Sequence, residues 1–300
     1  MSPPPPRAVV VVPTFRRPAM LAETLASLAA QVTRVPFAVL VVENDAAREG
    51  QRVAETLGVA VVVAPRQGNV EAINTGFAAA LERYPTAPYL LMIDDDETAA
   101  PEWLDRIVAA ADVSGAGIVG GPVTPRFDTE VGAAVRNHPV FWPIAAKSGP
   151  LPMIYGSGNC LIRRDVFTTL GLPAFDPAFN FLGGGDTDFF TRARTARVSF
   201  YWAADAMAVE CVPEARTRPA WIFRRGLRIG AINRRIDRKA RPQAVVLLKD
   251  LAVLALSLAR FLGVLVRSQS LLQASHPVVV ALGRLLSIGG IETRQYQAGK

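Results

Sequence analysis

The 300-residue sequence has few of the residues that hold disulfide-rich or metal-clustered proteins together. Its two cysteines, Cys160 and Cys211, lack the spacing of a metal-binding or redox motif. Two cysteines do not make a disulfide framework, so we expect both thiols to be reduced in a cytosolic setting. The N-terminus, MSPPPPR, has no apolar run of the kind that directs secretion, and its prolines predict a disordered stretch over residues 1–6.

Two common phosphate-binding motifs are also missing. The first predicted strand is followed by PTFRRP rather than Gly-x-Gly-x-x-Gly, so no glycine turn brings a pyrophosphate to a helix N-terminus. The Walker loop with its lysine is absent as well. These absences argue against a dinucleotide-dependent dehydrogenase and a P-loop enzyme. A nucleotide can still bind, provided that a metal ion and acidic side chains hold it.

Hydrophobic residues make up 50% of the chain, which is ample for the core of one large domain, alone or with an appendage. Short β-branched runs alternate with helical patterns through the first part of the sequence. This alternation is typical of a parallel sheet with helices on both faces, so we predict an α/β fold. The predicted strands cover residues 8–15, 37–45, 59–65 and 88–94, and the predicted helices cover 19–31 and 69–84.

Polar and acidic residues gather where these strands end, at the sheet edge where ligands bind in parallel sheets. The strand ends are Pro13-Thr14, Glu43-Asn44-Asp45 and Asp94-Asp95-Asp96. Three consecutive aspartates repel one another and invite raised pKa values unless a positive charge lies among them. A solvated loop is one interpretation of this run. A divalent cation at the end of a central strand is the other, and we favour it.

The pattern is less regular beyond residue 110. Residues 117–125 read as a strand and a turn, and residues 155–167 as a loop, a short strand and the start of a helix. The segment 179–196 places three glycines before Asp186 and Asp188, and a helix follows. Glycine permits positive φ and a close ligand approach, so we expect a binding turn here. An ordinary helix N-terminus with favourably placed acids is the alternative.

Six segments, taken in order, resemble the inverting family 2 glycosyltransferases of the GT-A fold. They are VVVPTFRR, VLVVEND, GNVEAINTGF, LLMIDDDETAAPEWL, GSGNCLIRRDVF and GGGDTDFFTRA. The resemblance covers about residues 7–225 and is to the bacterial exopolysaccharide branch, of the succinoglycan-synthesis type. It implies a Rossmann-like, mostly parallel sheet over residues 7–212. It also implies an inverting enzyme that moves a sugar from a nucleotide-sugar donor to a saccharide acceptor.

The resemblance implies roles for the strand-end residues. Asp94 and Asp96 match the family's metal motif, with Asp96 as the direct ligand of Mg²⁺ or Mn²⁺ and Asp94 near the ribose or the metal, while Asp95 is expected to point the other way. Hard divalent ions prefer carboxylate oxygens and bridge those of a diphosphate. The residues implied in nucleotide-sugar binding are Pro13, Thr14, Glu43, Asn44, Asp45, Arg66, Asn74, Asp94 and Asp95. For Arg66 and Asn74, ordinary loop and helix polarity is an alternative.

Asp186 matches the position of the family's catalytic base. An inverting transfer needs a carboxylate that takes the proton of the acceptor hydroxyl as that oxygen attacks the anomeric carbon. Relatives often have Gly-Glu-Asp here, whereas this chain has Gly185 before Asp186, so a glutamate contact to the acceptor is missing. Asp188 is the second candidate for the base, or it orients the helix that follows.

The C-terminal region, residues 213–300, is basic and partly apolar. Between Pro213 and Arg241 ten basic residues stand against two acidic ones, a local charge of +8 in a chain whose net charge is +7. Residues 221–239 place isoleucines on one helical face and arginines on the other, which predicts a basic amphipathic helix at a membrane interface. Packing on the catalytic domain is the alternative. Nucleic acid is disfavoured, because no aromatic or glycine module accompanies the arginines.

Two apolar segments follow, over residues 251–266 and 277–291, and each contains an arginine. Both are shorter than the ~20 apolar residues that span a bilayer. We therefore expect peripheral or monotopic attachment to an anionic membrane surface, at the cytoplasmic face of the inner (plasma) membrane, rather than two spans. This location is compatible with an acceptor sugar carried on a polyprenyl diphosphate lipid.

Two other functions are compatible with parts of the sequence. A nucleotidyltransferase shares the acidic metal-binding edge, but it needs a glycine- and lysine-rich loop after the first strand to hold a triphosphate. A non-catalytic, membrane-bound sugar-nucleotide binder is conceivable because of Gly185. The joint presence of Asp94, Asp96 and Asp186 argues against it.

Overall fold

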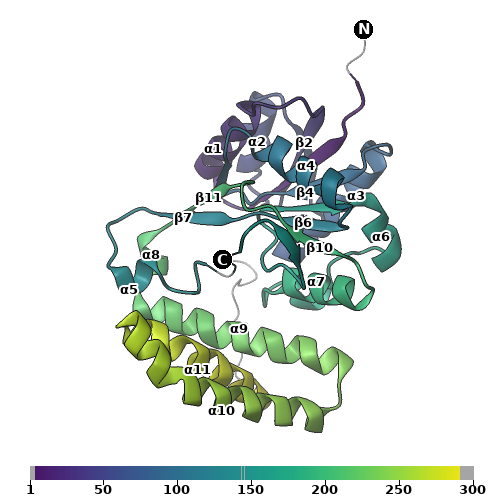
Figure 1. Ribbon diagram of the computed structural model, residues 1–300. Coiled ribbons are helices and arrows are strands. Elements are labelled where there is room, and N and C mark those ends of the chain that lie inside the picture. Colours follow the sequence, from purple (N-terminus) through teal and green to yellow (C-terminus); the bar gives the residue numbers. More distant parts are fainter. Residues whose placement is uncertain (1–3, 143, 145, 291–300) are drawn as a thin grey trace.

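The computed structural model describes residues 4–142, 144 and 146–290. Residues 1–3 of the stretch that we expect to be disordered lie outside the described residues, as does the last residue of the apolar segment 277–291. The remainder folds as a mixed α/β domain followed by three long helices (Figure 1).

An eight-stranded sheet with the order β3-β2-β1-β4-β9-β6-β10-β8 forms the centre of the α/β domain. Its first half is parallel and consists of β1 (Ala8–Thr14), β2 (Phe37–Glu43), β3 (Ala60–Val63) and β4 (Tyr89–Met92). The sheet then becomes mixed, because β9 runs antiparallel to β4 and β6, and β8 antiparallel to β10. These strands are β6 (Ile118–Gly120), β8 (Gly149–Leu151), β9 (Cys160–Arg163) and β10 (Phe200–Trp202). The predicted α/β class with a mostly parallel sheet is confirmed.

Helices pack on both faces of the sheet, as the alternating pattern predicts (Figure 1). Successive strand side chains point to opposite faces, so Val10 and Val12 belong to one core cluster and Val9 and Val11 to another. The first cluster includes residues of α1 (Pro18–Ala29), α2 (Glu49–Thr56) and α4 (Trp103–Ser114). The second includes residues of α3 (Asn69–Arg83), α6 (Arg164–Leu170) and α7 (Gly185–Thr195).

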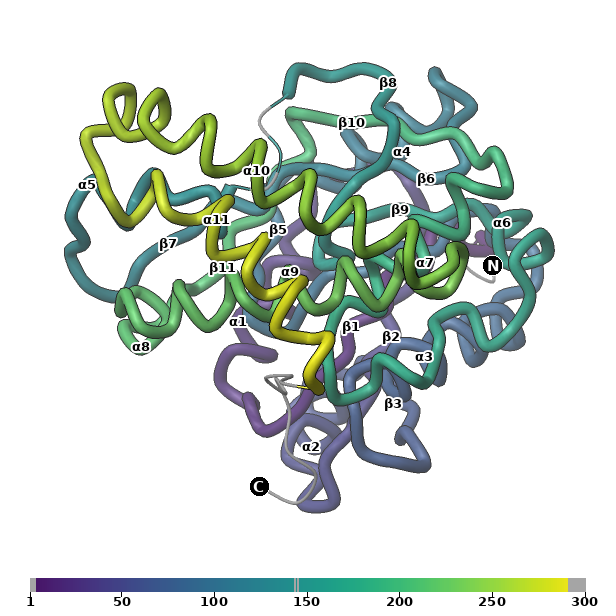
Figure 2. The backbone as a smooth tube through the Cα atoms, turned by 90° about the horizontal axis from the view of Figure 1, so that it is seen from below, coloured from purple at the N-terminus to yellow at the C-terminus, as the bar shows by residue number. Residues whose placement is uncertain are grey.

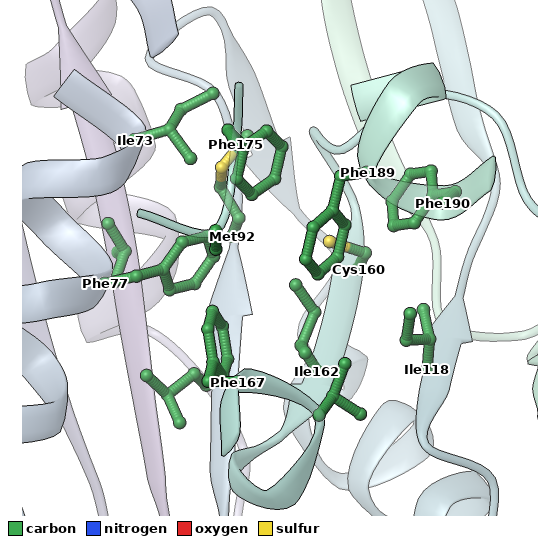
Figure 3. Packing of buried hydrophobic residues seen from close by; sticks show 14 of the residues in the cluster. Ile73, Phe77, Met92, Ile118, Cys160, Ile162, Phe167, Phe175, Phe189 and Phe190 are labelled. Carbon is green, nitrogen blue, oxygen red and sulfur yellow. The ribbon is translucent and has the colours of Figure 1, made fainter. Parts of the chain in front are cut away.

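Aromatic side chains fill the second cluster (Figure 3). The rings of Phe175 and Phe189 stack with centroids 4.6 Å apart and planes 8° apart, and Phe77 lies 5.0 Å from Phe167. All four side chains are buried. Because Phe189 belongs to α7, this packing fixes the start of α7 against α3 and the sheet.

A second sheet of three strands, in the order β5-β11-β7, lies beside the end of β4. It consists of β5 (Glu97–Ala99), β7 (Val123–Phe127) and β11 (Ala208–Val212). In its register Glu210 of β11 pairs with Glu97 of β5. Since β5 follows Asp96 directly, the small sheet brings another carboxylate to the aspartate run.

The C-terminal helices are α9 (Pro219–Ala240), α10 (Gln243–Ser268) and α11 (Leu271–Leu286), and α9 lies nearest the sheet (Figure 1). Figure 2 shows the three helices from below. The backbones of α9 and α11 approach closely, since a Cβ atom on Gly230 would lie only 2.0 Å from the carbonyl oxygen of Val280. The short helices α5 (Ala133–Arg136) and α8 (Glu214–Thr217), with the 3-10 turns Pro177–Phe179 and Ser287–Gly289, complete the described structure.

Buried ion pairs join the three helices. Asp250 of α10 is fully buried and accepts hydrogen bonds from Arg234 of α9 at 2.8 Å and Arg284 of α11 at 2.6 Å. One stretch of the described residues, Leu271–Gly289, could cross a membrane by length and composition alone. Breaking a buried ion pair is costly, so the burial of Arg284 favours α11 as a member of this packed bundle.

Candidate active site

A pocket of about 940 Å³ lies at the carboxyl ends of β1, β2 and β4 and extends to α9. Its walls come from the strand ends, the loop before α3, the glycine turn before α7, and the C-terminal helices. Seven of the residues singled out from the sequence line it: Pro13, Thr14, Asn44, Asp94, Asp95, Asp96 and Asp186. The fold therefore brings most of the predicted residues to one cavity.

The three consecutive aspartates have different surroundings. Asp95 accepts hydrogen bonds from Thr14 Oγ1 at 2.8 Å and from the backbone N–H of Phe15 at 3.2 Å, which ties the end of β4 to the end of β1. Asp96 forms ion pairs with Arg17 at 2.6 Å and with Arg216 at 3.6 Å. Arg17 also donates to Asp95 at 3.0 Å, so one guanidinium bridges the two carboxylates.

Carboxylates crowd this end of the pocket. The group comprises Asp94, Asp95, Asp96, Glu97 and Glu210. Burial, followed by the charges of Asp96 and Asp95, raises the pKa of Asp94 to about 8. Burial and then the charge of Asp94 raise the pKa of Glu97 well above its usual value. Burial also raises the pKa of Glu210. A bound cation would favour the ionised form of these groups.

The acidic group fits a divalent ion that is completed by a substrate. In the described part of the chain, no three His, Cys, Asp or Glu side chains are arranged to hold a metal ion by themselves. Mg²⁺ is commonly bound by one or two carboxylates together with waters and substrate phosphates. Asp94 and Asp96 line the pocket amid an excess of buried carboxylates, so they match that kind of site.

Two of the predicted nucleotide-binding residues shape the loops around the pocket. Glu43 accepts hydrogen bonds from the backbone N–H groups of Asp45 and Gln51, at 2.8 and 2.9 Å. These bonds hold the turn after β2 and the start of α2. Asn44 accepts from the backbone N–H of Gly68 at 2.7 Å and so fixes the loop that leads into α3. Glu43 itself is buried and does not line the pocket.

Three further predicted residues also lie off the pocket lining. Asp45 forms an ion pair with Arg16 at 3.1 Å. Arg66 is exposed and pairs with a glutamate in the first turn of α3. Asn74 exchanges two hydrogen bonds with the backbone of Phe175, at 2.8 and 2.9 Å. The side-chain partners of Arg66 and Asn74 agree with the alternative of ordinary loop and helix polarity.

The two candidate bases, Asp186 and Asp188, have different surroundings at the start of α7. Gly183 and Gly184 both have a φ of +83°, and α7 begins at Gly185, so Asp186 lies in the first helical turn and lines the pocket. Asp188 is only 1% exposed and forms ion pairs with Lys239 of α9 at 2.5 Å and with Arg192 at 2.9 Å. The structure thus gives Asp188 the surroundings of a residue that fastens α7 to α9.

The orientation of α9 differs from the one that its pattern predicts. Its isoleucines Ile222, Ile232 and Ile236 are buried, while Arg225 and Arg228 line the pocket. Two arginines of α9 therefore lie at the pocket, whereas Arg224 and Arg238 of the predicted arginine face are exposed. The helix α9 therefore packs on the catalytic domain, which is the alternative that the sequence left open beside an interfacial helix.

Several residues of the site escaped the sequence analysis. Glu210, Arg17 and Arg216 all contribute charge to the acidic end of the pocket. Arg17 lies just after the first predicted strand, and this position beside a strand end could have indicated that it belongs to the site. Glu210 lies in a five-residue strand far along the chain, and only the pairing of β11 with β5 brings it to the aspartates.

Comparison with known proteins agrees with this geometry. A model of the family described as glycosyl transferase family 2 matches residues 9–171. The succinoglycan biosynthesis protein ExoM of Rhizobium meliloti (strain 1021) is 35% identical over 234 residues, which are 74% of this chain and 72% of that protein. The resemblance inferred from the six motifs is thereby confirmed at the level of the family.

Two solved structures share the fold. S. aureus TarS 1–349, in complex with UDP, has a TM-score of 0.53 and 14% identity, and the match covers 98% of this chain and 95% of that one. The mannosyltransferase PcManGT from Pyrobaculum calidifontis, in complex with GDP-Man and Mn²⁺, has a TM-score of 0.55 and 19% identity, over 96% and 76% of the two chains. At these identities the likeness establishes the fold.

The different surroundings of Asp95 and Asp96 lead to different expected effects on stability. Asp95→Ala should lower the free energy of unfolding by roughly 1–3 kcal/mol, because Thr14 and Phe15 lose their acceptor. Asp96→Ala loses the ion pairs with Arg17 and Arg216 but relieves the repulsion with Asp94 and Asp95, so it should lower stability less than Asp95→Ala does. Urea denaturation in the presence of a chelator measures both. Equal losses in the two variants would contradict the assignment of Asp95 as the structural member.

Proposed function

The chain belongs to glycosyl transferase family 2, and we propose that it transfers a sugar, with inversion, from a nucleotide-sugar donor to a saccharide acceptor in exopolysaccharide synthesis. The observation that carries this proposal is the single pocket lined by Asp94, Asp96 and Asp186. The match to a protein named for succinoglycan biosynthesis supports the polysaccharide context. The same grouping disfavours a non-catalytic binder, and the absence of a triphosphate loop disfavours a nucleotidyltransferase.

We place the donor nucleotide at the strand ends. Pro13, Thr14 and Asn44 line that part of the pocket, and Asn44 and Asp95 hold its walls through the bonds to Gly68 and Thr14. Asp96, with Asp94, would hold Mg²⁺ or Mn²⁺. When bound, the ion offsets the negative charge that develops on the departing nucleoside diphosphate. Mn²⁺ accompanies GDP-Man in the mannosyltransferase of the same fold.

We assign the base to Asp186. Its carboxylate takes the proton of the acceptor hydroxyl, whose oxygen forms the new bond to the anomeric carbon on the face opposite the departing diphosphate. The first turn of α7 is a suitable place for this carboxylate, because Asp186 lines the pocket there. The aromatic packing of Phe189 and Phe175 holds that turn in position.

Asp186→Asn keeps the size of the side chain but cannot accept a proton. We expect transfer to fall by roughly 10²-fold or more, while the affinity for the nucleotide with Mn²⁺ stays nearly unchanged. Asp188→Asn is the matched variant, and it should lower thermal stability by loosening Lys239 and Arg192 while keeping most of the transfer rate. An inactive Asp188→Asn beside a fully active Asp186→Asn would show that the base lies two residues further on.

We further propose that the C-terminal helices attach the protein to the cytoplasmic face of the membrane, where a lipid-linked acceptor would be found. Support comes from a stripe of exposed side chains along α10: Leu248, Leu251, Leu258, Leu262 and Val266. Their spacing of three, four or seven residues puts them on one helical face. The exposed Arg260 and Arg267 flank the stripe, and Asp250, the acidic residue of α10, is buried. This combination favours an anionic bilayer over a second copy, in which like charges would meet.

Introducing charge into the α10 stripe should abolish attachment. Leu258→Glu with Leu262→Glu should remove most of the protein from anionic liposomes in sedimentation, because it places carboxylates in the apolar contact. Val113→Glu, at an exposed position of α4, is the matched control and should bind normally. Residual binding should weaken with salt, since each basic residue near the surface contributes roughly 1 kcal/mol. Full binding of the double variant would contradict α10 as the contact.

A further inference from the structure

The pocket has a second wall whose chemistry differs from that of the strand ends. The first wall is acidic, with the aspartate run and Glu210 at its centre. The second is formed by α9 and by the segment Pro139–Trp142, and it is basic and aromatic. A site that held only the donor would have no evident use for this wall.

Asp186 lies where the two walls meet. A Cβ atom on Gly185 would lie 2.7 Å from the side chain of Val70 in α3, and one on Gly184 would lie 2.3 Å from Ile232 of α9. The glycine turn is therefore wedged between the helix on the donor side and the helix of the second wall. The base assigned above faces both.

The aromatic part of the second wall is rigid and partly exposed. Trp221 and Phe141 stack with ring planes 5° apart and centroids 6.3 Å apart. Trp142 is 40% exposed, and its indole N–H donates to the carbonyl oxygen of Arg136 at 2.8 Å, which fixes the ring. Tyr155, 50% exposed, also lines the pocket. The electron-rich faces of such rings attract the weakly positive C–H groups of a sugar ring.

The basic part of this wall consists of Arg225 and Arg228, three residues apart on α9 and hence on one side of the helix. Arg225 lies near the acidic end of the pocket, because its charge acts on the carboxyl of Glu210. Arg228 is one turn further along α9. Guanidinium groups present paired N–H donors that match the oxygens of a phosphate, so a diphosphate is the ligand that this pair fits.

We propose that the second wall is the acceptor site, with Arg228 and Arg225 binding the diphosphate of a lipid-linked saccharide and Trp142 and Tyr155 contacting its sugar. This inference rests on the proposed function, since it assigns the acceptor side of the same pocket. It also explains why Arg225 and Arg228 line the pocket while Arg224 and Arg238 of the same helix are exposed. The acceptor hydroxyl would then enter from the α9 side and reach Asp186, opposite the donor.

Tryptophan fluorescence offers a direct binding assay, because Trp142, Trp202 and Trp221 line the pocket and only Trp103 among the four tryptophans lies elsewhere. The probes are farnesyl diphosphate for the carrier, farnesyl diphosphoryl glucose for a carrier with a sugar, and UDP or GDP with Mn²⁺ for the donor. Farnesol, which lacks the diphosphate, controls for binding of the apolar chain to α10.

Arg228→Gln should weaken farnesyl diphosphate about tenfold or more, while UDP and GDP change by less than about twofold. Arg228→Lys should restore part of the loss, and Arg224→Gln, at an exposed position of α9, should bind like the parent. The added glucose should tighten binding about three- to tenfold in the parent and not in Trp142→Leu.

Two results would overturn the acceptor site. An equal loss for farnesyl diphosphate and for UDP or GDP in Arg228→Gln would assign these arginines to the donor. Unchanged binding of every probe in Arg228→Gln would show that the diphosphate does not bind at this wall. Failure of the parent to bind UDP or GDP, with farnesyl diphosphate still bound, would instead count against the proposed transferase and leave the second wall as a lipid diphosphate site.

Discussion

Repulsion among the carboxylates at the end of β4 is the constraint on which the rest of the site depends. Burial and neighbouring charge raise the pKa of Asp94 to about 8, and Asp96 is held by Arg17 and Arg216. Such a group is stable only if positive charge is supplied, by arginines in the folded chain and, in the function proposed above, by a divalent cation. The placement of arginines on the loop after β1 and on α8 follows from this need.

The C-terminal region contributes to the candidate active site as well as forming an appendage, because α9 lines the pocket. The helix α9 contributes Arg225 and Arg228 to the pocket and Lys239 to the ion pair that fastens α7, whereas Arg234 of the same helix enters the buried network around Asp250. The opposite side of the bundle carries the exposed leucines of α10. The sheet, α9 and α10 thus follow one another outward (Figure 1). A membrane contact on α10 would place α9 between the membrane surface and the pocket.

Much of the α/β core could be predicted from local pattern, because β-branched runs and helical spacing fix which residues turn inward. The antiparallel insertion of β9 could not, since a four-residue strand does not reveal the direction of its partner. An amphipathic pattern also shows which residues of α9 share a face without showing what each face contacts. That only one of Asp186 and Asp188 would face the pocket could be predicted, because residues two apart in a helix point to nearly opposite sides.

The central claim is that Asp94 and Asp96 bind a divalent ion jointly with a nucleoside diphosphate. Calorimetric titration of Mn²⁺ into the protein, alone and with saturating UDP or GDP, tests it most directly. We expect Mn²⁺ to bind about tenfold or more tightly when the matching nucleotide is present. The affinity for the nucleotide should rise by the same factor when Mn²⁺ is present, and Asp96→Asn should abolish this coupling. Equal Mn²⁺ affinity with and without either nucleotide, or coupling that survives in Asp96→Asn, would contradict this account of the site.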